Sequence, residues 1–595
     1  MDRNSVIGFM LIGLVLLVWM WHNTPKPPTQ KLQPDTTIQK QKADIQEIPK
    51  AQEDQQIIPK TPTEKFGKYF STVASGTEKI IIVETDFYTT EITSKGGLIR
   101  KWELKHYKAW DRENLVQLVD FEKGGDFSLL FASSDGKLIE TRYLYFETDY
   151  QPWQKVEVKG DSENKVTLRL KAEGGGYIEK VLIFRNGSYS IDVDYKFVKM
   201  EPVISNFEYQ VIWENGLRYA ERNSVDESHN AKAFAYSGGE LAEIDATSDD
   251  PVKLNISGNT QWIATKTKYF AVAIISKDKK SEGAYLEGNH KKMPYHGMKE
   301  TYNIAMKMPF RSSKDNESSF TLFLGPLDFD IIKSYDVHLD QMMSLGWVWL
   351  IRPISEYFII PLLEFLHWFI PNYGLVIIVF SILIKLLLHP LSKTSLRSMQ
   401  KMQQLQPMIE EVKTKYKEDP QKMNKAVMNL YKEYGVNPAG GCLPLLLQMP
   451  ILYALWTVFG SAIQLRQANF IWWINDLSIP DVAVTLPFAI PIFNITDVSG
   501  LALMMGITMF IQQKMTVKDP RQKMMVYMMP ILLTLLFNSF PSGLNLYYFM
   551  FNLLSIVQQV YVTRKHKDEP LRKVEPKKKT GGIISKLTKN MPKMK

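Results

Sequence analysis

Lys385 is a charged residue inside the apolar run YGLVIIVFSILIKLLL, which covers residues 373–388. A cation well inside a membrane span costs about 3 kcal/mol unless water or a partner accommodates it, so an intramembrane lysine indicates a functional site. Ser381 lies one helical turn earlier on the same face, where its hydroxyl and the ammonium can line one polar cavity. The alternative is a lysine that extends to the membrane surface, because His389 and Pro390 indicate a nearby membrane edge.

A second series of polar residues lies toward the C-terminus of the chain. Its members recur at helical spacing and therefore share one face of a helix: Asn545, Tyr548, Asn552, Ser555 and Gln559. Such a polar stripe either lines a hydrophilic surface or joins neighbouring helices by hydrogen bonds. Both interpretations stay open on the sequence alone.

The elements that must position these residues are apolar helices. The hydropathy pattern predicts six membrane spans, at residues 6–21, 373–388, 443–459, 498–511, 524–537 and 544–562. Most of them are shorter than the roughly 20 residues that cross a hydrocarbon core, so the bilayer must thin or flanking residues must reach the surface. The first span has no small-residue cleavage site after it, which predicts an uncleaved anchor.

Composition excludes several classes of function. The chain of 595 residues is 45% hydrophobic with a mean hydropathy of −0.17, which predicts a mixture of water-exposed and lipid-exposed parts. Cys442 is the single cysteine, so an intrachain disulfide or a cysteine-based metal site is excluded. The glycine run at residues 174–176 lacks the lysine and the hydroxyl residue of a phosphate-binding loop. We expect no cofactor, no metal and no hydrolytic activity.

Basic residues predict the orientation of the chain in the membrane. Lys and Arg are concentrated in residues 393–432, 514–523 and 564–595, whereas residues 461–497 contain only Arg466. Basic loops are retained on the cytoplasmic side. Six spans then place both termini in the cytoplasm and the long stretch after the first span in the periplasm of a bacterium with two membranes.

The periplasmic stretch divides into a linker and a folded domain. Residues 23–64 are rich in proline and polar residues, which predicts a disordered tether. Alternating patterns follow, including a hairpin over residues 181–197 that turns at Asn186 and Gly187, and they predict a large β-sandwich. Its histidines show no metal-ligand spacing and are interpreted as surface or structural residues: His106, His229, His290, His296 and His338.

Two further segments flank the lysine-bearing span. Residues 346–371 are rich in tryptophan and interrupted by prolines, and we expect them to lie along the outer membrane interface. On the cytoplasmic side, apolar residues at three- and four-residue steps predict a helical hairpin over residues 393–435, with its turn at Asp419 and Pro420. Its methionines form either a packing seam or a docking surface.

Five short motifs resemble the YidC/Oxa/Alb family of membrane-protein insertases. They are KLLLHPLS at 385–392, LQP at 405–407, VNPAGGCLPLLLQMP at 436–450, LRQA at 465–468 and FPSGLNLYY at 540–548. The resemblance covers about residues 322–562, and the anchor with its external domain is similar to the Gram-negative YidC branch. It implies a five-helix core around a hydrophilic groove that is open to cytoplasm and lipid, and a galactose-mutarotase-like supersandwich outside.

The resemblance also implies roles for individual residues. Lys385 stands where the family usually has arginine, Ser381 takes a position often held by threonine, and Tyr548 takes that of the groove tyrosine. Lysine loses its proton more readily than arginine when desolvated and lacks its bidentate fork, so the groove must stay wet for the charge to persist. We assign Asn545 and Asn552 to the same groove.

The predicted architecture is a polytopic α-helical membrane protein with a large periplasmic all-β supersandwich. Its parts are an anchor (1–22), the linker (23–64), the sandwich (65–340), the insertase core with its cytoplasmic hairpin (341–563) and a basic cytoplasmic tail (564–595). We expect an insertase and chaperone for inner-membrane proteins, not an enzyme. The alternatives are a transporter that uses Lys385 and an anchored sugar-processing enzyme.

The expected partners are nascent membrane proteins and membrane lipids, with no role for DNA. The family resemblance adds the Sec translocon. The tail contains twelve basic and three acidic residues, so it could bind ribosomal RNA through phosphates or anionic lipid as an orientation signal.

Overall fold

The computed structural model describes residues 62–277, 280–294, 297–311, 316–436, 443–490, 495–516, 523–565 and Lys573. The predicted anchor, most of the linker, most of the tail, His296 and Cys442 therefore lie outside the described residues. The described chain forms two compact units, one up to Met343 and one from Ser344 onward.

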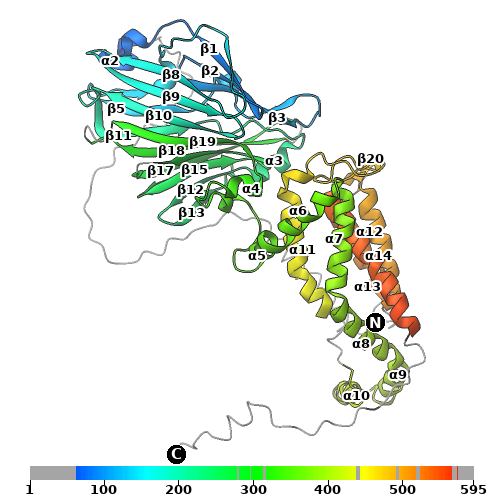
Figure 1. Cartoon of the computed structure of the whole chain (residues 1–595). Coiled ribbons are helices and arrows are strands. Elements are labelled where there is room, and N and C mark those ends of the chain that lie inside the picture. The colour runs from blue at the N-terminus through cyan, green and yellow to red at the C-terminus, as the bar shows by residue number, and fades with distance from the viewer. Residues whose placement is uncertain are drawn as a thin grey trace, which may run out of the picture. The chain divides into compact units, whose positions relative to one another are not determined.

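The first unit is built from three β-sheets, which confirms the predicted large all-β domain (Figure 1). A five-stranded sheet has the order β4 (Leu115–Gln117), β3 (Leu98–Lys108), β2 (Tyr88–Thr93), β1 (Ile80–Glu84), β7 (Gln154–Glu157). A six-stranded sheet has the order β14 (Val252–Ser257), β17 (Gly283–Lys292), β18 (Met298–Pro309), β11 (Ile204–Trp213), β5 (Ser128–Ser133), β6 (Leu138–Glu140).

The third sheet has eight strands and contains the predicted hairpin. Its order is β13 (Glu240–Ile244), β12 (Lys232–Ser237), β15 (Thr260–Lys266), β16 (Phe270–Ser276), β19 (Glu317–Pro326), β10 (Ser190–Val198), β9 (Gly176–Arg185), β8 (Glu163–Ala172). β9 and β10 pair antiparallel around Asn186 and Gly187, and Gly187 has a φ of 81°, which glycine adopts without strain. β19, which comes last in the sequence among the strands of this sheet, lies between β16 and β10.

Short helices complete the first unit. They are α2 (Pro62–Phe70), α3 (Ser224–Asn230) and α4 (Phe329–Lys333). α2 begins inside the last residues of the predicted linker, because Pro62 and Glu64 suit the first turn of a helix and Phe66 and Phe70 are buried. Three fully buried tryptophans, Trp102, Trp213 and Trp262, anchor the core of the unit.

A buried polar cluster lies between strands of the first unit. The ammonium of Lys180 donates to the carbonyl oxygens of Gly97 (2.7 Å) and Phe127 (2.8 Å), and burial lowers the pKa of Lys180 to about 7. Burial also raises the pKa of the nearby Asp126 carboxyl to about 8, although the backbone N–H of Phe127 and that of Glu214 donate to it. These hydrogen bonds depend on the position of the backbone around Asp126, so a shift of this backbone would leave buried polar groups without partners.

Gly125, which precedes Asp126, is expected to tolerate no side chain. A Cβ at Gly125 would lie 2.4 Å from the carbonyl oxygen of Ile99, whereas a Cβ at Gly124 meets no atom within 4 Å. Both glycines have a positive φ, 88° at Gly124 and 100° at Gly125, so alanine is strained by a similar amount at each position. Only Gly125→Ala adds a collision with the backbone. Gly125→Ala should lower the free energy of unfolding by about 3 kcal/mol and Gly124→Ala by about 1 kcal/mol. Urea unfolding monitored by tryptophan fluorescence measures both; equal losses would contradict the expectation.

The second unit is helical, and a helix forms at each of the five predicted spans that the structure describes. These helices are α7 (Tyr373–Leu387), α11 (Leu443–Ser461), α12 (Gly500–Thr516), α13 (Lys523–Phe537) and α14 (Ser542–Lys565). α14 packs against α7 and α12, and α12 packs against α13 (Figure 1). Within the described residues no single helix has both the length and the apolarity of a membrane span. α7 and the helix that follows it, α8 (His389–Gln404), have both only when taken together, and the chain bends by 63° between them.

The predicted hairpin is helical, with one difference from the expectation. It comprises α8 (His389–Gln404), α9 (Gln406–Lys415) and α10 (Pro420–Glu433), so its first arm is divided in two at Leu405. The cause is Pro407, which lacks the N–H that an uninterrupted helix needs and stands in the first turn of α9. Asp419 accepts a bond from the backbone N–H of Lys422 and caps α10, as the predicted turn requires.

The tryptophan-rich segment is more regular than its prolines indicate. It forms α5 (Ile351–Ile354), a π-helical turn (Ser355–Ile359) and α6 (Ile360–Phe369) without a gap. Pro353 stands in the first turn of α5, where its missing N–H breaks no helical hydrogen bond, and Pro361 is the second residue of α6, which follows the π-helical turn directly. The segment exposes large apolar side chains, among them Trp349 and Trp368.

The second unit also contains two strands, which the sequence pattern did not predict. A two-stranded hairpin, β20 (Val484–Ile490) with β21 (Ile495–Val498), lies between α11 and α12.

Candidate functional site

Lys385 lies on α7 and faces α14. Its ammonium donates to the hydroxyl of Ser555 at 2.6 Å and lies 4.5 Å from the ring centroid of Phe551, one turn earlier on α14. The side chain is half-buried, and among the described residues no carboxylate pairs with it. The positive charge is therefore held by one hydroxyl and one aromatic face, which leaves two of the three ammonium donors for other acceptors.

Ser381 is fully buried one turn before Lys385. Its hydroxyl donates to the carbonyl oxygen of Ile377 in the same helix at 2.7 Å. This back-bond satisfies the hydroxyl within α7. The structure thus places Ser381 beside Lys385 on one helix, yet brings the ammonium to Ser555 of the polar stripe and not to Ser381.

The polar stripe of α14 divides into two kinds of residue. Asn545 is fully buried, and its amide donates to the carbonyl oxygen of Phe537 at 3.1 Å, which ties α14 to the end of α13. Tyr548 and Asn552 are also buried, but the tyrosine hydroxyl and the asparagine Nδ2 have no hydrogen-bond partner within the described part of the chain. Asn545 thus joins two helices through its amide nitrogen, although its Oδ1 has no partner among the described residues, whereas the partnerless atoms of Tyr548 and Asn552 come without such a contact.

A set of amide contacts that the sequence did not predict lies toward the C-terminal end of α14. The amide nitrogen of Gln558 lies 3.0 Å from Nδ1 of His389 at the start of α8. The amide nitrogen of Gln559 donates to the hydroxyl of Thr516 on α12 at 3.1 Å. Gln403 of α8 in turn donates to the backbone oxygen of Thr516 at 2.7 Å. These contacts join α8, α12 and α14. The helical spacing of Gln559 with the stripe was the only signal for them in the sequence.

The outer surface of the helices around this polar face is apolar. Large exposed side chains lie on every helix of the group, including Leu386 on α7, Ile507 on α12, Ile531 on α13 and Val557 on α14. An exposed apolar surface of this extent marks a region that is covered by lipid or by another protein.

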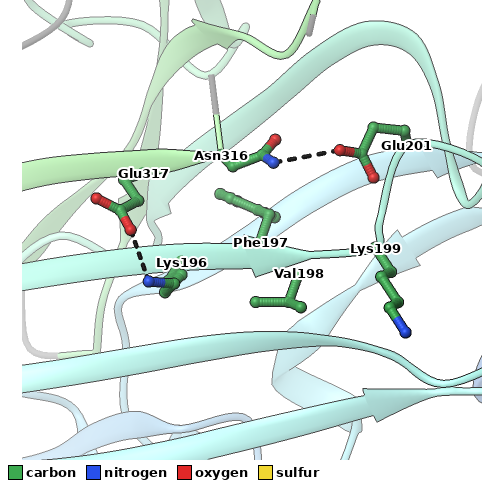
Figure 2. A pocket seen from close by; sticks show the side chains of 7 residues that line it. All are labelled: Lys196, Phe197, Val198, Lys199, Glu201, Asn316 and Glu317. Atoms are coloured by element: carbon green, nitrogen blue, oxygen red, sulfur yellow. Dashed lines mark hydrogen bonds and ion pairs between the residues drawn. The ribbon is translucent and has the colours of Figure 1, made fainter. Parts of the chain in front are cut away.

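The first unit has a pocket of about 450 Å³, and Figure 2 shows its seven lining residues. They are Lys196, Phe197, Val198, Lys199, Glu201, Asn316 and Glu317. Lys196 pairs with Glu317 at 2.8 Å, and Asn316 donates to Glu201 at 3.2 Å (Figure 2). Because these polar groups already bind one another, the pocket offers no reactive set of side chains.

The described histidines of the first unit take part in packing and polar contacts. His290 is buried with its Nδ1 3.5 Å from the carboxylate of Glu300, which also accepts bonds from Ser228 and Tyr302. The ring of His338 packs against Tyr236. In the described ranges no three His, Cys, Asp or Glu side chains gather closely enough to hold a metal ion.

Comparisons with known proteins match both units of the chain. Residues 365–569 match the family described as 60Kd inner membrane protein, and residues 80–356 match the YidC periplasmic domain. A membrane protein insertase YidC from Chloroherpeton thalassium is 37% identical over 580 residues, which cover 96% of this chain and 97% of the relative. A membrane protein insertase YidC from Prosthecochloris aestuarii is 39% identical over 588 residues, which cover 97% of this chain and 97% of the relative.

A crystal structure of an active YidC insertase, with its first transmembrane domain resolved, is also similar. It has a TM-score of 0.35 and 20% identity, over 83% of this chain and 94% of that chain. The two curated relatives match this chain over nearly its whole length at well above 30% identity. The chain therefore belongs to the YidC family of membrane protein insertases.

Proposed function

We propose that this inner-membrane protein inserts nascent membrane proteins through the polar face between α7 and α14, where Lys385 attracts an acidic segment of the client. The observation that carries the proposal is the ammonium of Lys385, which has a hydroxyl and a ring as neighbours but no carboxylate among the described residues. A charge in this state is expected to hold water or an incoming acidic group.

The unsatisfied atoms of Tyr548 and Asn552 support a wet surface. A buried polar atom without a partner costs about 1–3 kcal/mol, which water in a groove removes. Ser381, Lys385, Asn545, Tyr548 and Asn552 remain our proposed groove residues, with Asn545 in a structural role. Water there would shorten the apolar distance that a client's hydrophilic segment must cross, while burial of its apolar span in lipid drives insertion.

The proposed topology has both termini in the cytoplasm and several membrane spans. The match of residues 80–356 to the YidC periplasmic domain supports a periplasmic location of the β-sheet unit. The basic segments 393–432 and 514–523 are then cytoplasmic, together with the hairpin α8–α10. A client's apolar span would contact the outer sides of α11 and α13.

Two partners remain predictions from sequence and family resemblance. The ribosome is proposed to bind the basic tail, of which the structure describes little. The Sec translocon is proposed from the family alone. Neither a transporter nor a sugar-processing enzyme is favoured by an observation in the structure.

Reconstitution tests the proposed function. The purified protein in vesicles should integrate a small single-span client with an acidic outer segment, without nucleotide and without solute flux. Solute flux without integration would favour the transporter and contradict the proposal.

The periplasmic β-sheet unit is expected to be largely dispensable for insertion. Because β19 pairs with both β10 and β16, a deletion that stops just before β19 removes both of its neighbours and leaves this strand unpaired. We expect a deletion of residues 65–343 to retain most insertion activity in vesicles, and a deletion of residues 65–314 to accumulate poorly, because it exposes an unpaired apolar strand. Complete loss of insertion by the longer deletion, at normal abundance in the membrane, would contradict the expectation.

A further inference from the structure

The hairpin of β20 and β21 exposes apolar side chains. Val484 is 57% exposed and Phe488 is 61% exposed, and their neighbours Val482, Pro487 and Ala489 are exposed too. Successive residues of a strand point to opposite faces, so β20 is exposed on both faces.

The composition of this hairpin does not suit exposure to water on two sides. Residues 482–490 read VAVTLPFAI, with Thr485 as the one polar side chain and no charge. A two-stranded hairpin is marginally stable in water, and a strand with near-continuous apolar residues is normally covered on both faces. Something other than water is therefore expected to cover β20.

The loop before the hairpin adds an aromatic surface. Trp472 is 79% exposed, and its ring stacks on that of Trp473 with centroids 5.8 Å apart. The indole of Trp473 donates to Asp481 at 2.9 Å, directly before the hairpin. Indole rings with one polar end and one apolar face prefer the boundary between water and acyl chains.

Buried polar contacts fix the hairpin to the first turn of α12. Asp481 is buried and accepts bonds from the Ser499 hydroxyl (2.5 Å) and the Leu501 backbone N–H (3.0 Å). Thr485 donates to Asp497 across the two strands at 2.8 Å. The hairpin therefore lies at the level of the N-terminus of α12, whose lipid-suited face continues through Leu503 and Ile507.

We propose that this hairpin inserts into the outer-leaflet boundary of the lipid bilayer, beside the start of α12. The inference rests on the proposed membrane placement of α12. The absence of Lys and Arg between residues 467 and 513 fits a segment that faces lipid on the periplasmic side.

Lipid suits the hairpin better than a second copy of the chain. Pro487 in β20 has no backbone N–H, and β21 has only four residues, so both edges are poor templates for pairing with another strand. A hydrophilic partner fits poorly, because β20 carries no charge and the exposed carboxylate of β21, Asp497, already accepts a bond from Thr485. The bilayer is the remaining cover whose chemistry matches.

The proposal also accounts for the shortness of α12. Its 17 residues span about 26 Å at a rise of 1.5 Å per residue, less than a hydrocarbon core of about 30 Å. An apolar hairpin that occupies the outer boundary beside this helix would let the bilayer thin there.

Spin-label accessibility in the full-length protein tests the proposal. In a Cys442→Ser background, Val484→Cys and Phe488→Cys are labelled with a nitroxide, and the protein is reconstituted into phosphatidylethanolamine and phosphatidylglycerol vesicles. We expect collisions with oxygen to exceed those with a water-soluble nickel chelate several-fold, as at Ile507→Cys on α12. The aqueous reference is Lys171→Cys on the exposed side of β8.

The outcomes separate the possible covers. Nickel accessibility like that of the Lys171→Cys label would show a hairpin in water and overturn the proposal. Low accessibility to both reagents would show a hairpin covered by protein and overturn it as well. If the Ile507→Cys label itself were accessible to nickel, the proposed placement of α12 would have failed first, and the hairpin proposal with it.

Discussion

Lys385→Glu is expected to slow the insertion of a client with an acidic outer segment at least tenfold. Two charges 4 Å apart interact by about 4 kcal/mol at an effective dielectric constant of 20, and about 1.4 kcal/mol changes a rate tenfold. Reversal of the charge turns attraction into repulsion. Lys385→Arg keeps the charge and should insert this client at nearly the normal rate, whereas Lys385→Ala should be intermediate. Protease protection of the client in vesicles measures each rate.

Two controls isolate the effect of charge at this position. Lys393→Glu changes an exposed cation near the start of α8, two turns away, and should have little effect. A client whose acidic residues are replaced by their amides should be insensitive to all Lys385 variants. Equal insertion of the acidic client by the Arg, Ala and Glu variants, all at normal abundance, would show that Lys385 merely reaches the membrane surface.

The polar stripe of α14 should respond to substitution in two different ways. Asn545→Leu leaves the Phe537 carbonyl without its donor and should destabilise the helical unit by about 1–3 kcal/mol. Tyr548→Phe with Asn552→Leu removes polar atoms that have no partner in the described chain, so stability should be kept or raised while insertion falls several-fold. Thermal unfolding in detergent and insertion in vesicles give the two readouts.

The opposite pattern would assign the stripe differently. If Tyr548→Phe with Asn552→Leu unfolded the protein at a lower temperature and Asn545→Leu reduced insertion alone, the roles would be exchanged. Unchanged insertion by the double variant at normal stability would show that this part of the stripe does not act on clients.

Periodicity predicted the helices well because each has a strongly apolar composition or an amphipathic face. It also predicted the turn at Asp419, since proline and a capping carboxylate both act locally. The division of the first hairpin arm at Leu405 could have been read from Pro407. The prolines of residues 346–371 indicated interruptions, yet the chain stays helical from Ile351 to Phe369. Proline is tolerated in the first turn of a helix, and the sequence does not show where that turn begins.

Contacts between distant residues could not be predicted in the same way. The partner of Lys385 is 170 positions away, and Ser381, its neighbour in sequence, bonds its own helix. The division of the stripe into a structural Asn545 and an unsatisfied Tyr548 and Asn552 depends on where α13 ends. β20 was missed because residues 482–490 are too uniformly apolar to alternate.

The central position of β19 has a consequence for how this protein is made. Ser190 of β10 pairs with Phe323 of β19, and β16 pairs with the other edge of the same strand, so the eight-stranded sheet stays in two pieces until the last strand arrives. Synthesis proceeds from the N-terminus, and pairing across such a separation is slow. The eight-stranded sheet can therefore close only after residue 326 has been made, which in the proposed topology means that the unit would complete its folding in the periplasm.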